Sequence, residues 1–325
     1  MTAATVLIVT FNSRAHFARL KACLEAQTTT FELLILDNAS APEERPLPAD
    51  FPPHAKIIQS ELNLGFAAAN NRLAARAQTD FIALLNPDAF PEPDWLEQLL
   101  ACAARHEHAA AIGSSQIMDS DDARYDGLGD CLFALGGTWR GGHGMPRAAF
   151  EPIEGEVFSA CAAAALYRRA AWQEAEGFDE GFFCFGEDID LGFRLRLRGW
   201  TCVQAPAAHV RHIGGASTPS GLGAFYAARN GVWLYAKSLP GLLYWPLLPG
   251  HFLLLALRCA TSLFSENGRD YRRGVCAALA SLPRTWAQRG TIQRTRTVST
   301  AAFARVLTWS PLAMLRRRPK TISMN

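Results

Sequence analysis

Apolar stretches of strand length alternate with helix-like stretches over residues 5–106, and this alternation restricts the possible fold more than any other feature. The runs TVLIVT, FELLILD, KIIQ and DFIALLN have the continuous apolar character of buried strands, at residues 5–10, 31–37, 56–59 and 80–86. Helical patterns follow Asn12-Ser13 and occupy residues 65–77 and 95–106. Such alternation predicts an α/β fold with a mostly parallel central sheet and helices on both faces.

Polar residues stand directly after the predicted strands, where a parallel sheet offers its ligand site. Ligands of open α/β sheets bind beyond the carboxyl ends of the strands. The candidate binding residues are therefore Thr10, Asn12, Asp37, Asn38, Asn63, Gly65, Asn86 and Asp88. The same residue types also form turns and helix caps, so each position keeps that alternative interpretation.

The middle of the chain has weaker patterns. Residues 119–150 are rich in glycine and aspartate, which predicts a long loop excursion. Residues 157–172 indicate a strand of small residues that leads into a helix. Residues 178–200 indicate an aromatic, glycine-rich loop that ends in a helix, and the first turn of that helix carries several acids, a placement that suits the helix dipole.

The formal net charge of +2 conceals two oppositely charged regions. Residues 1–235 carry 18 lysines and arginines against 28 aspartates and glutamates, a charge of −10, whereas residues 236–325 carry 14 against 2, a charge of +12. The length also favours two domains, so we expect a boundary near residue 235. A basic region favours an anionic surface. Its aromatic residues are not interleaved with arginine in a stacking pattern, which argues against nucleic acid.

An uncharged apolar segment of 20 residues, 238–257, begins the basic region. Its length would just span a bilayer, but Pro240, Pro246 and Pro249 interrupt its first half, and prolines inside a helix are costly. We therefore expect a shallow hairpin or a helix that lies in the membrane interface. The alternative is a helix over 242–264 that packs against the first domain. The predicted C-terminal part is thus a helical, membrane-associating extension.

Cysteine usage and the N-terminus indicate where the chain works. The eight cysteines form no C-x-x-C pair and no zinc-ligand spacing, so we expect reduced thiols. The N-terminal MTAATVLIVTFNSR has no basic residues before its apolar stretch, unlike a secretory signal. We expect the protein in the cytoplasm, peripheral at the inner face of the cell membrane.

Three short motifs carry candidate chemistry, each with a simpler alternative. Asp88 in LNPDAF would hold Mg²⁺ or Mn²⁺ at the sheet edge, although Asn-Pro-Asp is also a strong turn. Glu187 and Asp188 in GEDIDLGFR would supply a general base, or would form a solvated acidic first turn. His209 and His212 would share a face of a helix, or would point to opposite sides of an extended segment, and a single histidine is more often structural.

The order of the motifs is more specific than any one of them. Along the chain follow VTFN, LDNAS, NLGFAAANN, LLNPDAF, FSACAAAALYRR, GFDEGFFCFGEDIDLGFRLRLRGW and HVRHIGGAS. This series resembles the inverting family 2 glycosyltransferases of the GT-A fold, and within them the rhamnosyltransferase-like group. The resemblance spans about residues 4–235, which would form the catalytic domain, with residues 236–325 as the membrane-associating region.

The resemblance implies a role for each motif. The nucleotide-sugar contacts would fall on Thr10, Asn12, Asp37, Asn38, Asn63, Gly65, Asn70 and Asn86. The Asp-x-Asp metal motif of the family appears as Asn86-Pro87-Asp88, which leaves Asp88 as its only carboxylate, and the metal-binding histidine matches His212 better than His209. The acid pair of the family falls on Glu187-Asp188, with Asp188 as catalytic base. Ala160-Cys161 replaces the usual small glycine before the alanine run.

The expected function is metal-assisted transfer of a sugar from a nucleotide-sugar donor, with inversion at the anomeric carbon. The resemblance favours rhamnose from dTDP-rhamnose as donor, and a hydroxyl of a lipid-linked or cell-surface glycan as acceptor. Transfer to a polyprenyl phosphate is an alternative. Another alternative is a catalytically silent membrane scaffold of the same fold. Against it stands the presence of all four candidate active-site residues, Asp88, Glu187, Asp188 and His212. The expected partners are the donor, the acceptor and an anionic membrane surface, without nucleic acid; the sequence does not give the oligomeric state.

Overall fold

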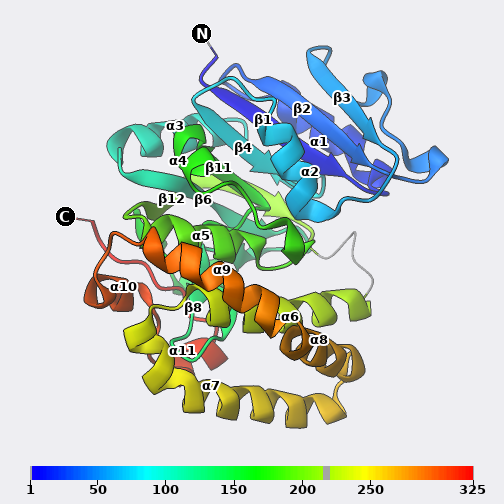
Figure 1. Ribbon diagram of the computed structural model, residues 1–325. Helices are drawn as coiled ribbons and strands as arrows, with labels where there is room; N and C mark the ends of the chain where they lie inside the picture. Colours follow the sequence, from blue (N-terminus) through cyan, green and yellow to red (C-terminus); the bar gives the residue numbers. More distant parts are fainter. Residues whose placement is uncertain (1, 215–219, 325) are drawn as a thin grey trace.

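The computed structural model describes residues 2–214 and 220–324; residues 1, 215–219 and 325, which include the end of HVRHIGGAS, lie outside it. The described residues form one ten-stranded sheet flanked by helices (Figure 1). The sheet runs in the order β10-β12-β6-β11-β4-β1-β2-β3, with β5 beside β12 and β7 beside β6. Its strands are β1 (Ala4–Thr10), β2 (Glu32–Asn38), β3 (Ala55–Ser60), β4 (Phe81–Leu85), β5 (Ala89–Pro91), β6 (Ala109–Met118), β7 (Asp121–Gly127), β10 (Gly155–Val157), β11 (Ala164–Arg168) and β12 (Thr201–His212).

Parallel pairing dominates the N-terminal half of the sheet. Strands β3, β2, β1 and β4 are all parallel, and the pairing of Thr10 with Asp37 brings the last residues of β1 and β2 side by side. Beyond β4 the sheet is mixed, because β11 lies antiparallel between β4 and β6, whereas β6 and β12 are parallel. The carboxyl ends of β1, β2 and β4 therefore meet at one edge, as the alternating pattern predicts.

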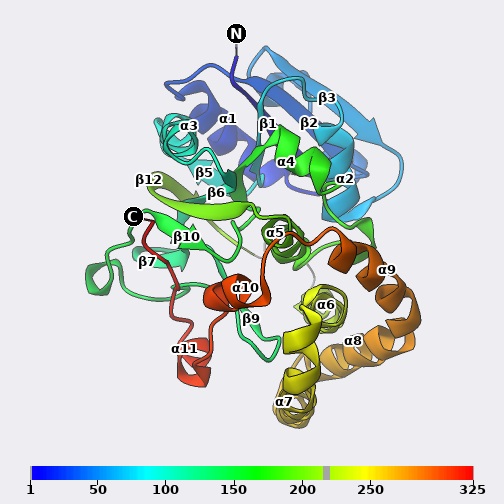
Figure 2. The ribbon, with the colours of Figure 1, turned by 60° about the vertical axis from the view of Figure 1, so that its left-hand side comes forward.

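Helices cover both faces of the sheet, as the sequence predicts. On one face, α1 (Phe17–Glu25) and α3 (Trp95–Arg105) pack against alternate strand residues such as Ile8 and Ile35. On the other, α2 (Gly65–Ala74), α4 (Arg169–Glu174) and α5 (Glu187–Leu197) pack against residues such as Leu7. Figure 2 shows α1 and α3 on one side of the sheet and α2, α4 and α5 on the other. The α/β fold is confirmed.

The prediction of a long loop over residues 119–150 is wrong. This segment contains β7, and also β8 (Asp130–Leu132) and β9 (Thr138–Arg140), which pair as a separate two-stranded sheet. Its residues from Tyr125 to Ala134 are buried. Strands of three residues give too few alternations for a periodic signal, and their glycines and aspartates imitate a loop. Two of these aspartates, Asp126 and Asp130, lie beside the candidate site.

The C-terminal region consists of helices. They are α6 (Ser220–Ser238), α7 (Gly241–Thr261), α8 (Gly268–Ala280), α9 (Leu282–Arg294), α10 (Thr300–Val306) and α11 (Pro311–Leu315). A third apolar core joins Phe193 of α5 to Leu234 of α6, Tyr244 of α7 and Phe303 of α10. Because α6 runs through residue 235, the change in composition falls inside a helix that packs on the α/β part.

Helix α7 corrects the prediction of a hairpin. Pro246 and Pro249 lie inside one continuous helix of 21 residues. Each proline removes one backbone donor, so the carbonyls of Leu242 and Trp245 lose their usual helical partners without ending the helix. Because Leu242 and Trp245 are exposed, those carbonyls do not have to be satisfied inside a packed core.

The alternative, a helix that packs against the first domain, holds for one side of α7 only: His251 Nδ1 lies 2.7 Å from the Leu135 carbonyl oxygen, but most of the apolar side chains of α7 are uncovered. Tyr244 and His251 are its buried residues, while Leu242, Trp245, Phe252, Leu253 and Leu257 are exposed. Among the described residues, Gly241–Phe264 is the one helical stretch long and apolar enough to cross a membrane, and only 11% of its most apolar window is buried. It lies at the far end of the molecule from β1–β3 (Figures 1 and 2).

Candidate active site

A cavity of about 640 Å³ opens at the carboxyl ends of β1, β2 and β4, closed on the other side by residues 183–189 and by α6. Of the twelve site residues predicted from sequence, eight line it: Asn38, Asn63, Gly65, Asn86, Asp88, Glu187, Asp188 and His212. Segments that are far apart in the sequence thus converge on one cavity, where the strand-end rule places it.

Asn38, the last residue of β2, holds together the loop that precedes α2. Its side-chain oxygen accepts a hydrogen bond from the Leu64 backbone N–H at 2.8 Å, and its amide donates to the Asn63 side-chain oxygen at 3.0 Å. The Asn63 oxygen also accepts from the Gly65 backbone N–H at 2.9 Å. These bonds satisfy the polar groups of the loop internally and fix one wall of the cavity.

Gly65 begins α2 in a conformation that favours glycine. Its φ is +79°, a left-handed value, and a Cβ there would lie 2.7 Å from the Phe183 carbonyl oxygen. That carbonyl accepts a hydrogen bond from the Ala67 backbone N–H at 3.1 Å. The absence of a side chain at residue 65 therefore lets the start of α2 contact the loop before α5 across the cavity.

The remaining four predicted residues support the cavity from outside its lining. The Thr10 hydroxyl donates to the buried Asp37 carboxylate at 3.4 Å, and that carboxylate also accepts from the Ser40 backbone N–H at 3.3 Å. The Asn12 side-chain oxygen accepts from the Ala41 backbone N–H at 2.9 Å. The fourth, Asn70, lies buried within α2, where its amide donates to a backbone carbonyl one turn earlier.

Asp88 and His212 face each other in the manner of two ligands of one metal ion. His212 ends β12, an extended segment, and is buried, whereas His209 is half-buried and does not line the cavity. His212 Nε2 lies 3.4 Å from Asp88 Oδ1 and has no hydrogen-bond partner among the described residues. The other ring nitrogen, Nδ1, lies 2.7 Å from Asp126 Oδ2. A carboxylate on one ring nitrogen and a free second nitrogen is the usual arrangement of a metal-binding histidine.

His212 lies between two carboxylates, and the three groups change one another's pKa. Burial lowers the pKa of His212, but the contacts with Asp126 and Asp88 outweigh it and raise the pKa above its usual value. Burial raises the pKa of Asp126, but His143, His212 and Arg140 lower it far more, so this carboxylate stays ionised. Burial also raises the pKa of Asp88, but the contact with His212 lowers it more, so the Asp88 pKa lies below its usual value.

The acid pair begins α5 and lines the same cavity. Asp188 Oδ2 accepts a hydrogen bond from the Ala162 backbone N–H at 3.1 Å, and Oδ1 accepts from the Ile189 N–H at 2.8 Å. Burial raises the pKa of Asp188 despite these bonds. Glu187 is more strongly affected, because burial and the neighbouring Asp188 raise its pKa well above the usual range, and its Oε2 has no partner among the described residues.

Asp130 and Arg140 join the site although the sequence analysis missed them. Both line the cavity, from β8 and β9, and Asp130 lies close to Cys161 and Asp188. Burial and Asp188 raise the pKa of Asp130 well above its usual value, and the Ser159 hydroxyl donates to it at 3.2 Å. Arg140 pairs with Asp126. The signal that would have found them is the pair of aspartates in YDGLGD, which the expected loop concealed.

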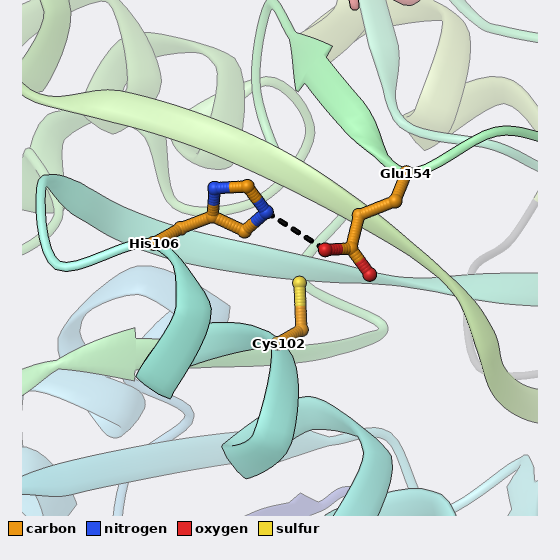
Figure 3. A group of neighbouring side chains, drawn as sticks. All are labelled: Cys102, His106 and Glu154. Carbon is orange, nitrogen blue, oxygen red and sulfur yellow. Dashed lines mark hydrogen bonds and ion pairs between the residues drawn. The ribbon is translucent and has the colours of Figure 1, made fainter. Parts of the chain in front are cut away.

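A second cluster of metal-ligand types lies elsewhere and has another explanation. Cys102, His106 and Glu154 approach one another at the end of α3 (Figure 3). His106 Nε2 lies 2.8 Å from Glu154, and the Arg105 guanidinium binds both carboxylate oxygens at 3.0 and 2.6 Å. The carboxylate is thus already neutralised, and none of these residues lines the cavity. The ion pair and hydrogen bonds of this cluster connect the end of α3 to the segment before β10.

Comparison with known proteins decides the family. The model of glycosyl transferase family 2 matches residues 5–174, more than half of the chain. The chain belongs to that family. This glycosyltransferase is 29% identical over 232 residues to the N-acetylglucosaminyl-diphospho-decaprenol L-rhamnosyltransferase of Mycobacterium tuberculosis, which covers 64% of this chain and 75% of the relative. It is therefore a family 2 enzyme of the rhamnosyltransferase-like group.

Another curated relative and two solved structures are also similar to this chain. The O-antigen biosynthesis protein RfbC of Myxococcus xanthus is 30% identical over 224 residues, which are 65% of this glycosyltransferase and 17% of that protein. Among solved structures, S. aureus TarS 1–349 shares the fold with a TM-score of 0.54 at 15% identity, covering 90% of each chain. A Pyrobaculum calidifontis mannosyltransferase, solved with GDP-Man and Mn²⁺, has the same TM-score and identity and covers 94% of this chain and 86% of that one.

Proposed function

We propose that this glycosyltransferase moves a sugar, rhamnose from dTDP-rhamnose, onto a hydroxyl of a lipid-linked or cell-surface glycan with inversion of configuration. The observation that carries the proposal is one cavity holding both a metal-type pair, Asp88 and His212, in which His212 Nε2 has no hydrogen-bond partner among the described residues, and a half-buried carboxylate, Asp188. The rhamnosyltransferase relative supports the donor and the lipid-linked acceptor, because its name specifies rhamnose and a diphospho-decaprenol.

The walls formed by β1, β2 and the start of α2 would take the nucleotide. Asn38, Asn63, Gly65 and Asn86 line this side, and Thr10, Asn12 and Asp37 hold its backbone in place. In this assignment Asp37 and its neighbours serve the nucleobase and ribose, while Asn70 acts through the α2 helix in which it is buried.

Asp88 and His212 would hold a divalent cation, and the free Nε2 fits that role because a buried nitrogen without a partner is costly. When bound, the cation would neutralise the charge that develops on the leaving nucleotide diphosphate. An imidazole ligand favours Mn²⁺ over Mg²⁺, which prefers oxygen ligands. Asp126 would keep the Nδ1 of His212 protonated, so that Nε2 presents its lone pair.

Asp188 would act as general base. As the acceptor oxygen bonds to the anomeric carbon and the bond to the diphosphate breaks, the hydroxyl proton would pass to an Asp188 carboxylate oxygen. A raised pKa makes that carboxylate a better proton acceptor near neutral pH, and its two backbone N–H contacts fix its direction. Glu187 would support it as the adjacent acid. One displacement of this kind inverts the anomeric configuration.

The proposed setting is the cytoplasmic face of the membrane. The exposed apolar side chains of α7 and the charge of residues 236–325 suit an anionic bilayer surface, at which a lipid-linked acceptor would be presented. In this view residues 1–235 perform the transfer and residues 236–325 hold the enzyme at the membrane.

The function is tested by transfer assays with the full chain and Mn²⁺. A panel of nucleotide sugars that includes dTDP-rhamnose is supplied with a synthetic N-acetylglucosaminyl diphosphate lipid, and products are identified by mass spectrometry and NMR. We expect a rhamnosylated lipid of inverted configuration and loss of activity in EDTA that Mn²⁺ restores. Retained configuration would reject the single displacement, transfer to polyprenyl phosphate would favour the alternative acceptor, and nucleotide binding without transfer to either acceptor would favour a silent scaffold.

Membrane association is tested by sedimentation with vesicles of phosphatidylcholine and phosphatidylglycerol. The double substitution Trp245→Glu and Leu253→Glu places charges on the exposed side of α7 and should release the protein from the vesicles. Leu47→Glu, at a leucine in the α/β part that is also more than half exposed, is the control and should bind as the wild type does. Unchanged binding of the α7 variant would remove α7 as the anchor.

A further inference from the structure

The loop directly before the acid pair is held in a strained conformation. Phe183, Phe185 and Gly186 have φ values of +65°, +68° and +84°, and the first two are residues that rarely adopt the left-handed region. Each such residue raises the free energy of the folded protein and persists only where its surroundings impose it. Phe183 and Phe185 line the cavity, and the loop ends at Glu187. The loop must therefore be held in place by other parts of the chain.

Asn230 on α6 holds the loop. Its side chain is 1% exposed, and its Nδ2 lies within hydrogen-bond distance of three carbonyl oxygens: Phe182 at 3.2 Å, Cys184 at 2.9 Å and Phe185 at 2.6 Å. The neighbouring Arg229 donates to the carbonyls of Gly181 and Phe182 at 2.8 and 2.9 Å. Arg229 and Asn230, two adjacent residues of α6, thus bind four of the five carbonyls from Gly181 to Phe185.

The same helix also binds the chain just after the acids. Lys237, 1% exposed, pairs with Asp190 in the first turn of α5 at 2.9 Å, and with Asp179 ahead of the loop. Asp190 is further fixed by Arg194 at 2.8 Å. Helix α6 therefore contacts the segment on both sides of Glu187 and Asp188.

We infer that Asn230 is a positioning residue for the proposed general base. It holds residues 182–186, of which Phe183, Phe185 and Gly186 have positive φ, in the conformation from which Asp188 faces the cavity, and it does so through the backbone carbonyls of that loop, although Asn230 also lies at the lining of the cavity. This inference rests on the proposed function, since it acts through Asp188. It also makes α6 part of the transfer machinery, although α6 continues into the basic region. Removal of residues 236–325 would take Lys237 with it, so truncation disturbs this segment as well as the membrane contact.

The test combines kinetics with hydrogen exchange on the full chain. Asn230→Ala should lower kcat about 10- to 100-fold, as expected for a misplaced reacting group, while donor KM changes less than about threefold. Without any substrate, exchange of the amides of residues 181–190 should become faster in the variant. Asn230→Ser retains one hydroxyl donor, should fall between alanine and wild type, and serves if the alanine variant does not fold. Gln293→Ala is the control, because that amide donates to the Ser238 carbonyl of α6 at 2.9 Å outside the cavity.

Each outcome decides the inference. A kcat within twofold of the wild type, together with unchanged exchange over residues 181–190, would overturn it. A kcat loss matched by Gln293→Ala, or an equal loss of donor binding, would reduce Asn230 to general support of the fold. If the wild type transfers no sugar, the proposed function fails instead, and the exchange experiment still decides whether Asn230 holds the loop.

Discussion

The two sides of the cavity differ in how their polar groups are satisfied. On the nucleotide side, Asn38, Asn63 and the backbone before α2 bond to one another. On the acid side, His212 Nε2 and Glu187 Oε2 are buried without hydrogen-bond partners among the described residues. The raised pKa values of Glu187 and Asp188 lie on the acid side as well.

This difference distinguishes the groups that fix the shape of the cavity from the groups that act on its ligands. A polar group that is satisfied within the protein sets the form of a wall, and its loss is expected to change binding or stability. A buried group without a partner raises the free energy of the folded protein until a ligand supplies one, so such groups mark where ligands act. Substitutions on the acid side should therefore change catalysis, and those on the nucleotide side should change binding and folding.

The largest effect is expected at Asp188. Asp188→Asn keeps the size of the side chain but removes its ability to take a proton, and general-base help typically contributes about 10²–10⁴-fold. We expect kcat to fall by about that factor while the Kd for the nucleoside diphosphate in the presence of Mn²⁺ stays near wild type. Transfer kinetics and titration calorimetry measure the two quantities. Undiminished turnover would show that Asp188 is not the general base. An equal loss of nucleotide affinity would show that Asp188 serves nucleotide binding instead.

Asp126→Asn should weaken metal binding and leave the general-base role of Asp188 unchanged. Its carboxylate contacts His212 Nδ1, and replacing the outer partner of a metal-binding histidine typically lowers metal affinity about 10- to 100-fold. Calorimetric titration of the protein with Mn²⁺ measures this. Asp119→Asn, which removes a half-buried carboxylate paired with Arg19, is the control and should leave the affinity unchanged. Equal Mn²⁺ affinities for wild type and Asp126→Asn would separate Asp126 from the metal site.

Gly65→Ala tests the nucleotide side. The left-handed φ and the close approach of Phe183 mean that a methyl group strains the backbone and pushes the two walls apart, at a cost of about 1–3 kcal/mol. We expect a lower Tm and weaker nucleotide binding, with kcat at saturating donor reduced less than in Asp188→Asn. Gly144→Ala also replaces a glycine of positive φ, but it has open space around it, so it reports the backbone strain alone. Equal losses in the two variants would contradict a role for the contact with Phe183.

The sequence predicted the parts of this comparison that depend on strong local patterns. The buried strands at residues 5–10, 31–37 and 80–86 placed the strand ends, and five of the residues predicted there line the cavity; Glu187, Asp188 and His212, which also line it, were predicted from their motifs and the family resemblance. It failed where local signals are weak: β6 and β12 are rich in alanine, and β8 and β9 have only three residues each. Asp126 and Asp130 stand in a segment whose composition resembles a loop, and Asn230 reaches the site through tertiary contacts with a segment far along the chain, which no local pattern records.

The smallest effect concerns the pH dependence of stability on the acid side. Burial and Asp188 raise the pKa of Asp130 well above its unfolded value of about 4, so folding takes up a proton between these two values. Where the folded protein binds more protons than the unfolded chain, the free energy of unfolding falls as pH rises, by at most about 1.4 kcal/mol per pH unit for one proton. Asp130→Asn cannot take up that proton, so its stability should fall less steeply above pH 4. Urea unfolding of the metal-free protein from pH 4 to 8 measures both slopes, and identical slopes would show that Asp130 is ionised in the folded protein.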